Sequence, residues 1–442
     1  MNPAQQGIYF QWLLEPESPY YNYQILLECA GSNTDRIRRA LGQALRANPQ
    51  LMAKFGVDST GRFTQTFPIS AIDMDEISIH EVASAQEARK ICWMKAAVPF
   101  NLEEGPAIAV DEIRINGYST WFVLTMNEIL IDGWGAMKFM EQLISLFECR
   151  NMDDQEIEVK TAMTSALEYF QHLSKPEEIS AEAREFWSKS LDEVKSCFPL
   201  RDTLNSSCDP YAASVIEVSL DDEATAEIRS TAHALSTSPF AVFVAAYSLA
   251  LAAVSDQHDF VVGAPVAGRN DEYEIGVPTL MLNMIAIRTR IDVEKKISDT
   301  VRSMISNVTE AVSFGDSVFS KVVSEFADHT NEDPLFSTMV NMLTYPSLEF
   351  WDGDRSLHLT ELNTGFTKYD ASLYIQRHGE DYTLQLAYKV AYVTPERANK
   401  VLALTAWFLT SDWLSGKTTV ANAIKTALND CDTSQITMLK SY

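Results

Sequence analysis

Two carboxyl groups lie four residues apart in the segment Asn127-Glu128-Ile-Leu-Ile-Asp132-Gly133, which follows an apolar run at 121–125. A carboxylate serves as a catalytic base only when its pKa approaches the working pH, and an ordinary glutamate has a pKa of about 4.3. Burial would raise the pKa of Glu128, and a buried Asp132 would add to this effect unless an arginine paired with it. Asn127 cannot titrate. The chemistry of this segment therefore depends on what surrounds it.

Other residue types that carry chemistry lack the spacing that makes a site. The seven histidines have no H-x-x-x-H or H-x-x-E-H spacing, so we expect no metal site. Ser248 lies in AAYSLALAA, without the G-x-S-x-G turn of a nucleophilic serine. Gly263 and Gly268 are too sparse for a phosphate-binding loop, and we expect them to permit tight turns around Pro265. No tightly bound cofactor is predicted.

The composition is typical of a globular protein with a substantial core, since 46% of its 442 residues are hydrophobic. Lys and Arg number 35 against 61 Asp and Glu, which gives a net charge of −26. Such a charge repels phosphate backbones and anionic lipids, so we expect no binding to nucleic acid or membrane. The six cysteines are scattered and form no C-x-x-C pair, as is typical of free thiols in a reducing compartment. The N-terminal segment lacks the pattern of a signal peptide. The longest apolar run, 240–254, is shorter than the about 20 residues that span a membrane. We expect a cytoplasmic protein.

Hydrophobic spacing predicts helices and strands in both halves of the chain. The predicted helices are 35–47, 136–149, 162–173, 181–191, 239–255 and 301–312. The predicted strands are 63–67, 107–115, 121–125, 213–220, 260–262, 284–291, 339–343, 371–375 and 383–388. An acidic segment at 151–159 is expected to interrupt this pattern, and the aromatic residues between 9 and 23 are expected in the core or between lobes. The alternation favours two similar α/β lobes, 1–175 and 176–442.

Short motifs along the chain match one family pattern in order. The segment 127–133 resembles H-H-x-x-x-D-G without either histidine. Residues 3–10, 99–106 and 261–269 are similar to S-x-x-Q-x-x-x-x-F, P-F-D-L-x-x-G-P and V-G-x-P-V-A-G-R. Residues 275–288 resemble I-G…N…L-R, and residues 367–370 resemble T-K-F-D. Residues 48–55 lie where the family has R-H-x-x-L-R-x-x-F, but Asn48 and Met52 replace the expected His and Arg. Together these motifs resemble the condensation-domain superfamily of nonribosomal peptide synthetases over essentially the whole chain.

The resemblance implies two chloramphenicol-acetyltransferase-like lobes in a V-shape, with a tunnel between them. Carrier proteins would dock on opposite faces, and their phosphopantetheine arms would enter the tunnel as visiting ligands. The second motif histidine of the family positions or deprotonates the acceptor amine, so Glu128 is the candidate catalytic residue, with Asn127 beside it. The motif aspartate is structural and pairs with an arginine, which assigns this role to Asp132 and its predicted partner Arg269. The other motif residues expected at the site are Gly133, Trp134, Pro265, Gly268 and Asn283.

Three interpretations follow from the missing histidines. We favour a platform that no longer condenses, binds carrier proteins among adjacent synthetase domains, and recruits a trans-acting tailoring enzyme, either a β-hydroxylase or a cytochrome P450. The alternative is an active acyltransferase in which Glu128 replaces the histidine and an amide forms between a carrier-bound donor and an amine acceptor. A minor alternative is heterocyclisation, whose motif D-x-x-x-x-D-x-x-S matches here only at Asp132.

Overall fold

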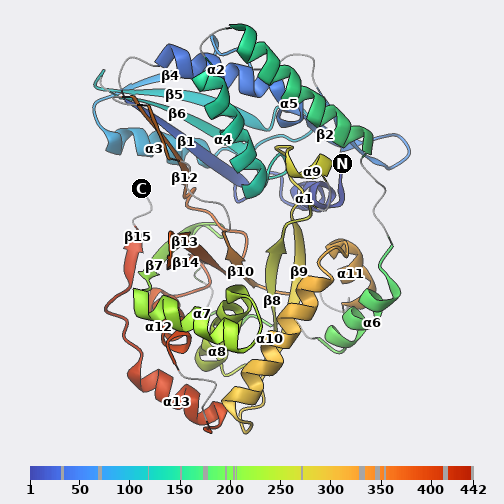
Figure 1. Cartoon of the computed structure of the whole chain (residues 1–442), viewed down its shortest axis with the longest axis vertical. Helices are drawn as coiled ribbons and strands as arrows, with labels where there is room; N and C mark the ends of the chain where they lie inside the picture. The colour runs from blue at the N-terminus through green and yellow to red at the C-terminus, as the bar shows by residue number, and fades with distance from the viewer. Residues whose placement is uncertain are drawn as a thin grey trace.

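The protein consists of two α/β bodies stacked along its long axis, each built on one large sheet (Figure 1). The computed structural model describes residues 1–30, 34–67, 72–117, 119–149, 152–172, 178–194, 197–202, 205, 207–269, 272–327, 334–343, 349–352, 355–411 and 417–439. The predicted lobe boundary at residue 175 lies outside these described residues.

The upper body in Figure 1 contains a six-stranded sheet in the order β11-β12-β1-β6-β5-β4. Its strands are β1 (Asn22–Ala30), β4 (Ser78–Val82), β5 (Ile108–Ile115), β6 (Ser119–Asn127), β11 (Glu349–Asp352) and β12 (Arg355–Leu362). The helices of this body are α1 (Pro3–Leu14), α2 (Thr34–Ala47), α3 (Ala85–Ala96), α4 (Gly133–Glu148) and α5 (Met152–His172). A short 3-10 helix, η1 (Pro49–Met52), and a hairpin, β2 (Lys54–Val57) with β3 (Phe63–Thr66), complete it.

Two of these strands come from the second half of the chain. β12 pairs antiparallel with β1, with Leu362 opposite Gln24 and Leu357 opposite Cys29, and β11 pairs with β12 in turn. The chain therefore returns from the lower body to the edge of the upper sheet before it completes the lower sheet. This crossing fixes the residues that follow β12 at the junction of the two bodies.

The lower body contains a seven-stranded sheet in the order β15-β7-β14-β13-β10-β8-β9. Its strands are β7 (Ala213–Ser219), β8 (Asp259–Val266), β9 (Asn283–Arg290), β10 (Thr338–Met342), β13 (Ala371–His378), β14 (Asp381–Lys389) and β15 (Thr437–Leu439). Its helices are α6 (Ala181–Ser190), α7 (Asp222–Ala234), α8 (Pro239–Ser255), α10 (Ile297–Ser313), α11 (Phe319–Phe326), α12 (Pro395–Leu409) and α13 (Val420–Asp430), and α9 (Glu272–Ile275) reaches the upper body (Figure 1).

The long apolar run of the sequence is the core helix α8, which has buried residues on all sides. Ser238 caps its first turn and Pro239 begins it, as expected for a helix start. In the described ranges no single helix is long and apolar enough to cross a membrane, and α7 with α8 passes that test only as a pair bent by 107°.

The predicted acidic interruption at 151–159 is wrong, because α5 continues through it. Asp153 and Asp154 lie in the first helical turn, where negative side chains are favourable beside the positive end of the helix dipole. Val159, Ala166 and Tyr169 recur at helical spacing and are buried. A short apolar stripe thus stabilises this helix despite its acidic beginning.

Candidate active site

Glu128 lies just beyond the end of β6, at the junction of the two bodies. Its backbone N–H donates to the carbonyl oxygen of Tyr21 at 2.8 Å, and its own carbonyl accepts from Ile131 N at 3.2 Å. The preceding Asn127 is buried, and its side-chain oxygen accepts from the N–H of Ile129 at 3.0 Å. Backbone contacts and the Asn127 turn therefore fix where residue 128 presents its side chain.

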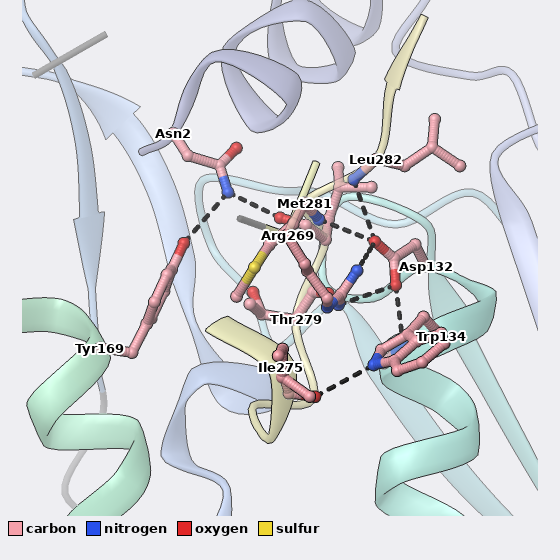
Figure 2. A network of polar contacts seen from close by, with 11 residues as sticks. Asn2, Asp132, Trp134, Tyr169, Arg269, Ile275, Thr279, Met281 and Leu282 are labelled. Carbon is pink, nitrogen blue, oxygen red and sulfur yellow. Dashed lines mark hydrogen bonds and ion pairs between the residues drawn. The ribbon is translucent and has the colours of Figure 1, made fainter. Parts of the chain in front are cut away.

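Asp132 ends this loop and begins α4. Figure 2 shows its carboxylate accepting from both terminal nitrogens of Arg269, at 2.8 and 3.0 Å, in a pair whose side chains are 4% and 3% exposed. The same carboxylate caps the helix by accepting from Gly135 N at 2.7 Å, and it also accepts from the N–H groups of Met281 and Leu282 at 2.8 and 3.0 Å. The predicted pairing of Asp132 with Arg269 is thus present in the structure.

The segment 277–282, which precedes β9, joins the two bodies beside this loop. The N–H of Leu280 donates to the carbonyl of Leu130 at 3.1 Å, and Gln50 Nε2 donates to the carbonyl of Pro278 at 3.1 Å. Asn2, the cap of α1, donates to the carbonyl of Leu280 at 2.6 Å. These bonds attach the segment both to the loop that carries Glu128 and to the N-terminal helix.

The other predicted motif residues support this junction. Gly133 is the first residue of α4, and Trp134 Nε1 donates to the carbonyl of Ile275 at 3.0 Å (Figure 2). Asn283 Nδ2 donates to the carbonyls of Gly315 and Ser317, both at 2.7 Å, and its Oδ1 accepts from Phe319 N at 3.2 Å. These residues position segments of the junction.

Pro265 and Gly268 require a correction to the turn that the sequence predicts. Pro265 lies within β8, where it pairs with Met284, so it is part of a strand. A Cβ at Gly268 would lie 2.0 Å from the carbonyl oxygen of Met281. A side chain is excluded there by the close approach of two backbone segments, and Gly268 has no left-handed backbone that a turn would need.

A lysine joins Glu128 at the junction. Lys368 follows β12 in the chain, and its Nζ lies 5.0 Å from the ring centre of Tyr21 and 5.2 Å from that of Tyr369. Distances of this size are typical of cation–π contacts. Because Tyr21 also accepts the backbone hydrogen bond of Glu128, the lysine and the glutamate are arranged around one tyrosine.

Burial raises the pKa of the Glu128 carboxyl to about 7, while Lys368 acts to lower it and Glu361 to raise it further. For Lys368 burial acts to lower the pKa, but its coupling to Tyr21, Tyr369 and Glu128 outweighs this and raises it above the usual value. Burial also raises the pKa of Tyr374, with Glu128 and Glu361 adding to the effect. Glu128, Lys368 and Tyr374 thus form one electrostatically coupled group, in which the pKa of each departs from its ordinary value.

Glu128 and Lys368 combine lost hydration with contact to solvent. Loss of hydration is the largest influence on the pKa values of both residues, yet the Lys368 side chain is exposed and Glu128 only partly buried. Solvent therefore reaches both side chains at the junction.

Sequence reasoning missed the residues that surround Glu128. Lys368 lies in the segment 367–370 that carries a family motif, and this was the one signal that could have singled it out. Glu361 and Tyr374 lie in no motif, and only the crossing of β12 and the start of β13 bring them to Glu128. In the described ranges no group of three His, Cys, Asp or Glu side chains could hold a metal ion.

Comparisons with known proteins agree with this architecture. The family model described as Condensation domain matches residues 1–402. A component of the linear gramicidin synthase of Brevibacillus parabrevis is 23% identical over 388 residues, which are 84% of this chain and 7% of that protein. Surfactin synthase subunit 2 of Bacillus subtilis (strain 168) is 24% identical over 407 residues, which are 90% of this chain and 11% of that protein.

Solved structures share the fold. A four-domain nonribosomal peptide synthetase bound to AMP and glycine matches with a TM-score of 0.77 at 15% identity, over 95% of this chain and 33% of that one. The first condensation domain of the calcium-dependent antibiotic synthetase, bound to a substrate analogue, matches with a TM-score of 0.70 at 16% identity, over 95% and 97% of the two chains. These matches confirm the predicted chloramphenicol-acetyltransferase-like class of fold.

The chain belongs to the condensation-domain family, since the family model covers most of it. It spans about a tenth of the length of the two synthetase proteins named above.

Proposed function

We propose that this domain forms amide bonds between a carrier-bound acyl thioester and an amine acceptor, with Glu128 as the general base. The observation that carries this proposal is the position of Glu128, which lies at the junction of the two bodies, is only partly buried and has its pKa raised to about 7. A base is most effective when its pKa lies near the working pH. The surroundings thus give the carboxyl a pKa close to that of an ordinary histidine, about 6.5.

The proposed reaction needs one proton acceptor and close positioning. The amine nitrogen attacks the thioester carbonyl carbon and forms the C–N bond, while Glu128 accepts the proton that the nitrogen loses. The C–S bond then breaks, and the leaving thiolate takes this proton from Glu128. Much of the barrier reduction comes from holding the two reactants together, which a rigid junction such as that around Asp132 favours.

The proposed partners are carrier-protein domains that deliver both substrates on phosphopantetheine arms. These arms are visiting ligands, and we propose no tightly bound cofactor. The exposed side chain of Lys368 and the only partly buried Glu128 support this, because an arm must reach Glu128 from outside. We further propose that the domain works in the cytoplasm beside other synthetase domains.

The test is the product of the full-length synthetase that contains this chain, carrying Glu128→Ala or Glu128→Gln. Mass spectrometry is expected to find a peptide truncated before the bond that this domain forms. Glu128→His, which returns an imidazole to the same place, is expected to restore the full-length peptide at least in part. Glu182→Ala, an exposed carboxylate in the first turn of α6, is the matched control and should leave the yield as it is. Full-length peptide at normal yield from Glu128→Ala would contradict the proposal.

The second candidate function is the non-condensing platform that recruits a β-hydroxylase or a cytochrome P450. Two observations favour it: the amide of Asn127 is engaged in its turn, and α1 exposes Phe10, Leu13 and Leu14 on one face. Exposed apolar side chains that share a face are typical of protein contacts. If this function is correct, Phe10→Ser with Leu14→Ser should remove the oxidative modification from the peptide and leave its length unaltered.

A further inference from the structure

The backbone that carries Lys368 is anchored on both sides. The N–H of Thr367 donates to the carbonyl of Tyr211 at 3.1 Å. Asp370 accepts from Arg201 Nε at 2.7 Å and from its Nη2 at 3.3 Å, in a pair where the carboxylate is almost fully buried. The position of the Lys368 backbone at the junction is therefore determined by contacts that do not involve its own side chain.

The side chain of Lys368 is directed by two aromatic rings. Its Nζ lies 5.0 Å from the ring centre of Tyr21 and 5.2 Å from that of Tyr369. Tyr21 is buried, and its carbonyl oxygen accepts a hydrogen bond from the N–H of Glu128. The Lys368 ammonium group and the backbone of Glu128 thus both contact Tyr21.

The charge of Lys368 is available to a ligand. Its side chain is exposed, and the described contacts of its Nζ are with the rings of Tyr21 and Tyr369. Glu128 opposes it only in part, because its carboxyl is close to half ionised near neutrality. We propose that Lys368 is a second catalytic residue, whose ammonium group binds the thioester carbonyl oxygen and stabilises the negative charge that this oxygen gains.

This inference rests on the proposed function, and it adds a hydrogen-bond donor for the oxyanion that forms in the reaction. When the amine attacks, the C–N bond forms and the carbonyl π electrons move to the oxygen. Lys368 donates a hydrogen bond to this oxyanion, while Glu128 holds the proton from the nitrogen. When the C=O bond forms again, the C–S bond breaks and the thiolate leaves. A donor already aimed at the developing oxyanion lowers the barrier, because it needs no reorganisation during the reaction.

The experiment measures amide formation by the 442-residue chain with N-acetylcysteamine thioesters. A panel of N-acylaminoacyl donors and aminoacyl acceptors replaces the carrier-bound substrates, and rates are followed between about pH 5.5 and 9. The variants are Lys368→Met and Lys368→Gln, which remove the charge, and Lys368→Arg, which keeps it. Urea unfolding of each variant tests whether it is folded, and the second neutral variant serves if the first is not.

Two effects of the lysine can be separated by pH. Lys368 lowers the pKa of Glu128, so its removal should move the acid inflection of the rate to higher pH. Removal of Glu361, as Glu361→Gln, should move the same inflection to lower pH, since Glu361 raises that pKa. On the plateau above the inflection Glu128 is ionised in every variant, and only the loss of oxyanion stabilisation remains.

We expect the plateau rate to fall about 100-fold in Lys368→Met, the size found when one oxyanion donor is removed, and to stay within about 10-fold of the unchanged chain in Lys368→Arg. A wild-type plateau in Lys368→Met, with a displaced inflection alone, would overturn the inference. If the unchanged chain forms no amide with any thioester pair, both this inference and the proposed function fail. If Glu128→Gln keeps the full rate while Lys368→Met loses it, only the role of Glu128 is wrong.

Discussion

Substitution of Asp132 should cost more stability than that of any exposed charge in this chain. Its carboxylate accepts five hydrogen bonds, two from Arg269 and one each from the N–H groups of Gly135, Met281 and Leu282. Asp132→Ala removes all five. Among the described residues, the guanidinium of Arg269, whose side chain is 3% exposed, then keeps the carbonyl of Thr279 at 2.8 Å as a neutral partner.

The expected loss follows from leaving this cation buried without its counter-charge. Breaking a buried ion pair from one side costs about 3–5 kcal/mol, which is a large part of the about 5–15 kcal/mol that stabilises an ordinary folded protein. Asp132→Asn keeps a capping oxygen for α4 and loses the charge, so it should fall between the native chain and Asp132→Ala. Asp132→Ala with Arg269→Met should be more stable than the sum of its single changes predicts, because no buried charge is left.

The measurement is the urea midpoint followed by circular dichroism. The control is Glu185→Ala, which breaks an exposed pair with Lys189 at 2.6 Å, where the two side chains are 68% and 73% exposed. Such pairs contribute about 0–1 kcal/mol. If Asp132→Ala shifts the midpoint no further than this control, or if the double substitution is simply additive, the junction is not held by the buried pair and our reasoning is wrong.

Two further outcomes test the close packing and the electrostatics of the same region. Gly268→Ala places a Cβ 2.0 Å from the Met281 carbonyl oxygen and should cost about 1–3 kcal/mol, seen as a lower urea midpoint, whereas Gly276→Ala meets no atom within 4 Å and should be neutral. The pKa of Glu128 is about 7 in the folded chain, against an ordinary value of 4.5 that we take for the unfolded chain. Between these two pH values the folded chain still holds the proton and the unfolded chain has released it. The free energy of unfolding should therefore fall as the pH rises from 4.5 to about 7. The free energy of unfolding of the native chain, compared with that of Glu128→Gln by urea unfolding across this range, should change by at most about 3 kcal/mol. If the difference between the two chains stays constant with pH, the raised pKa is contradicted.

The local parts of the site could be predicted from the sequence. The apolar strand before residue 128 and the helix after Asp132 each leave a pattern within about twenty residues, and both are present as β6 and α4. The helix begins at Gly133, three residues before the predicted start, because Asp132 caps it. The pairing of Asp132 with Arg269 was accessible too, since both lie in motifs of one family.

The long-range parts of the site left no such pattern. β1, a central strand of the upper sheet, was not predicted, because its apolar residues face both sides: Ile25 and Leu27 face one core cluster and Leu26 another. Pairing of β12 with this strand joins residues more than three hundred positions apart, and spacing within either segment does not encode it. Glu361 and Lys368 reach Glu128 only through that pairing, so the charges that modify its pKa beside the larger effect of burial were outside the reach of local reasoning.

These contacts explain how position 128 can change its chemistry while the fold is kept. The loop from Asn127 to Asp132 is held by the backbone of Glu128 on Tyr21, by the Asn127 turn and by the carboxylate of Asp132. None of these bonds uses the Glu128 side chain, so the loop presents whatever group stands there at the same place. Its surroundings then set the proton affinity, and burial moves a carboxyl from 4.5 to about 7. A carboxyl with this pKa therefore exchanges protons in the same pH range as an ordinary imidazole.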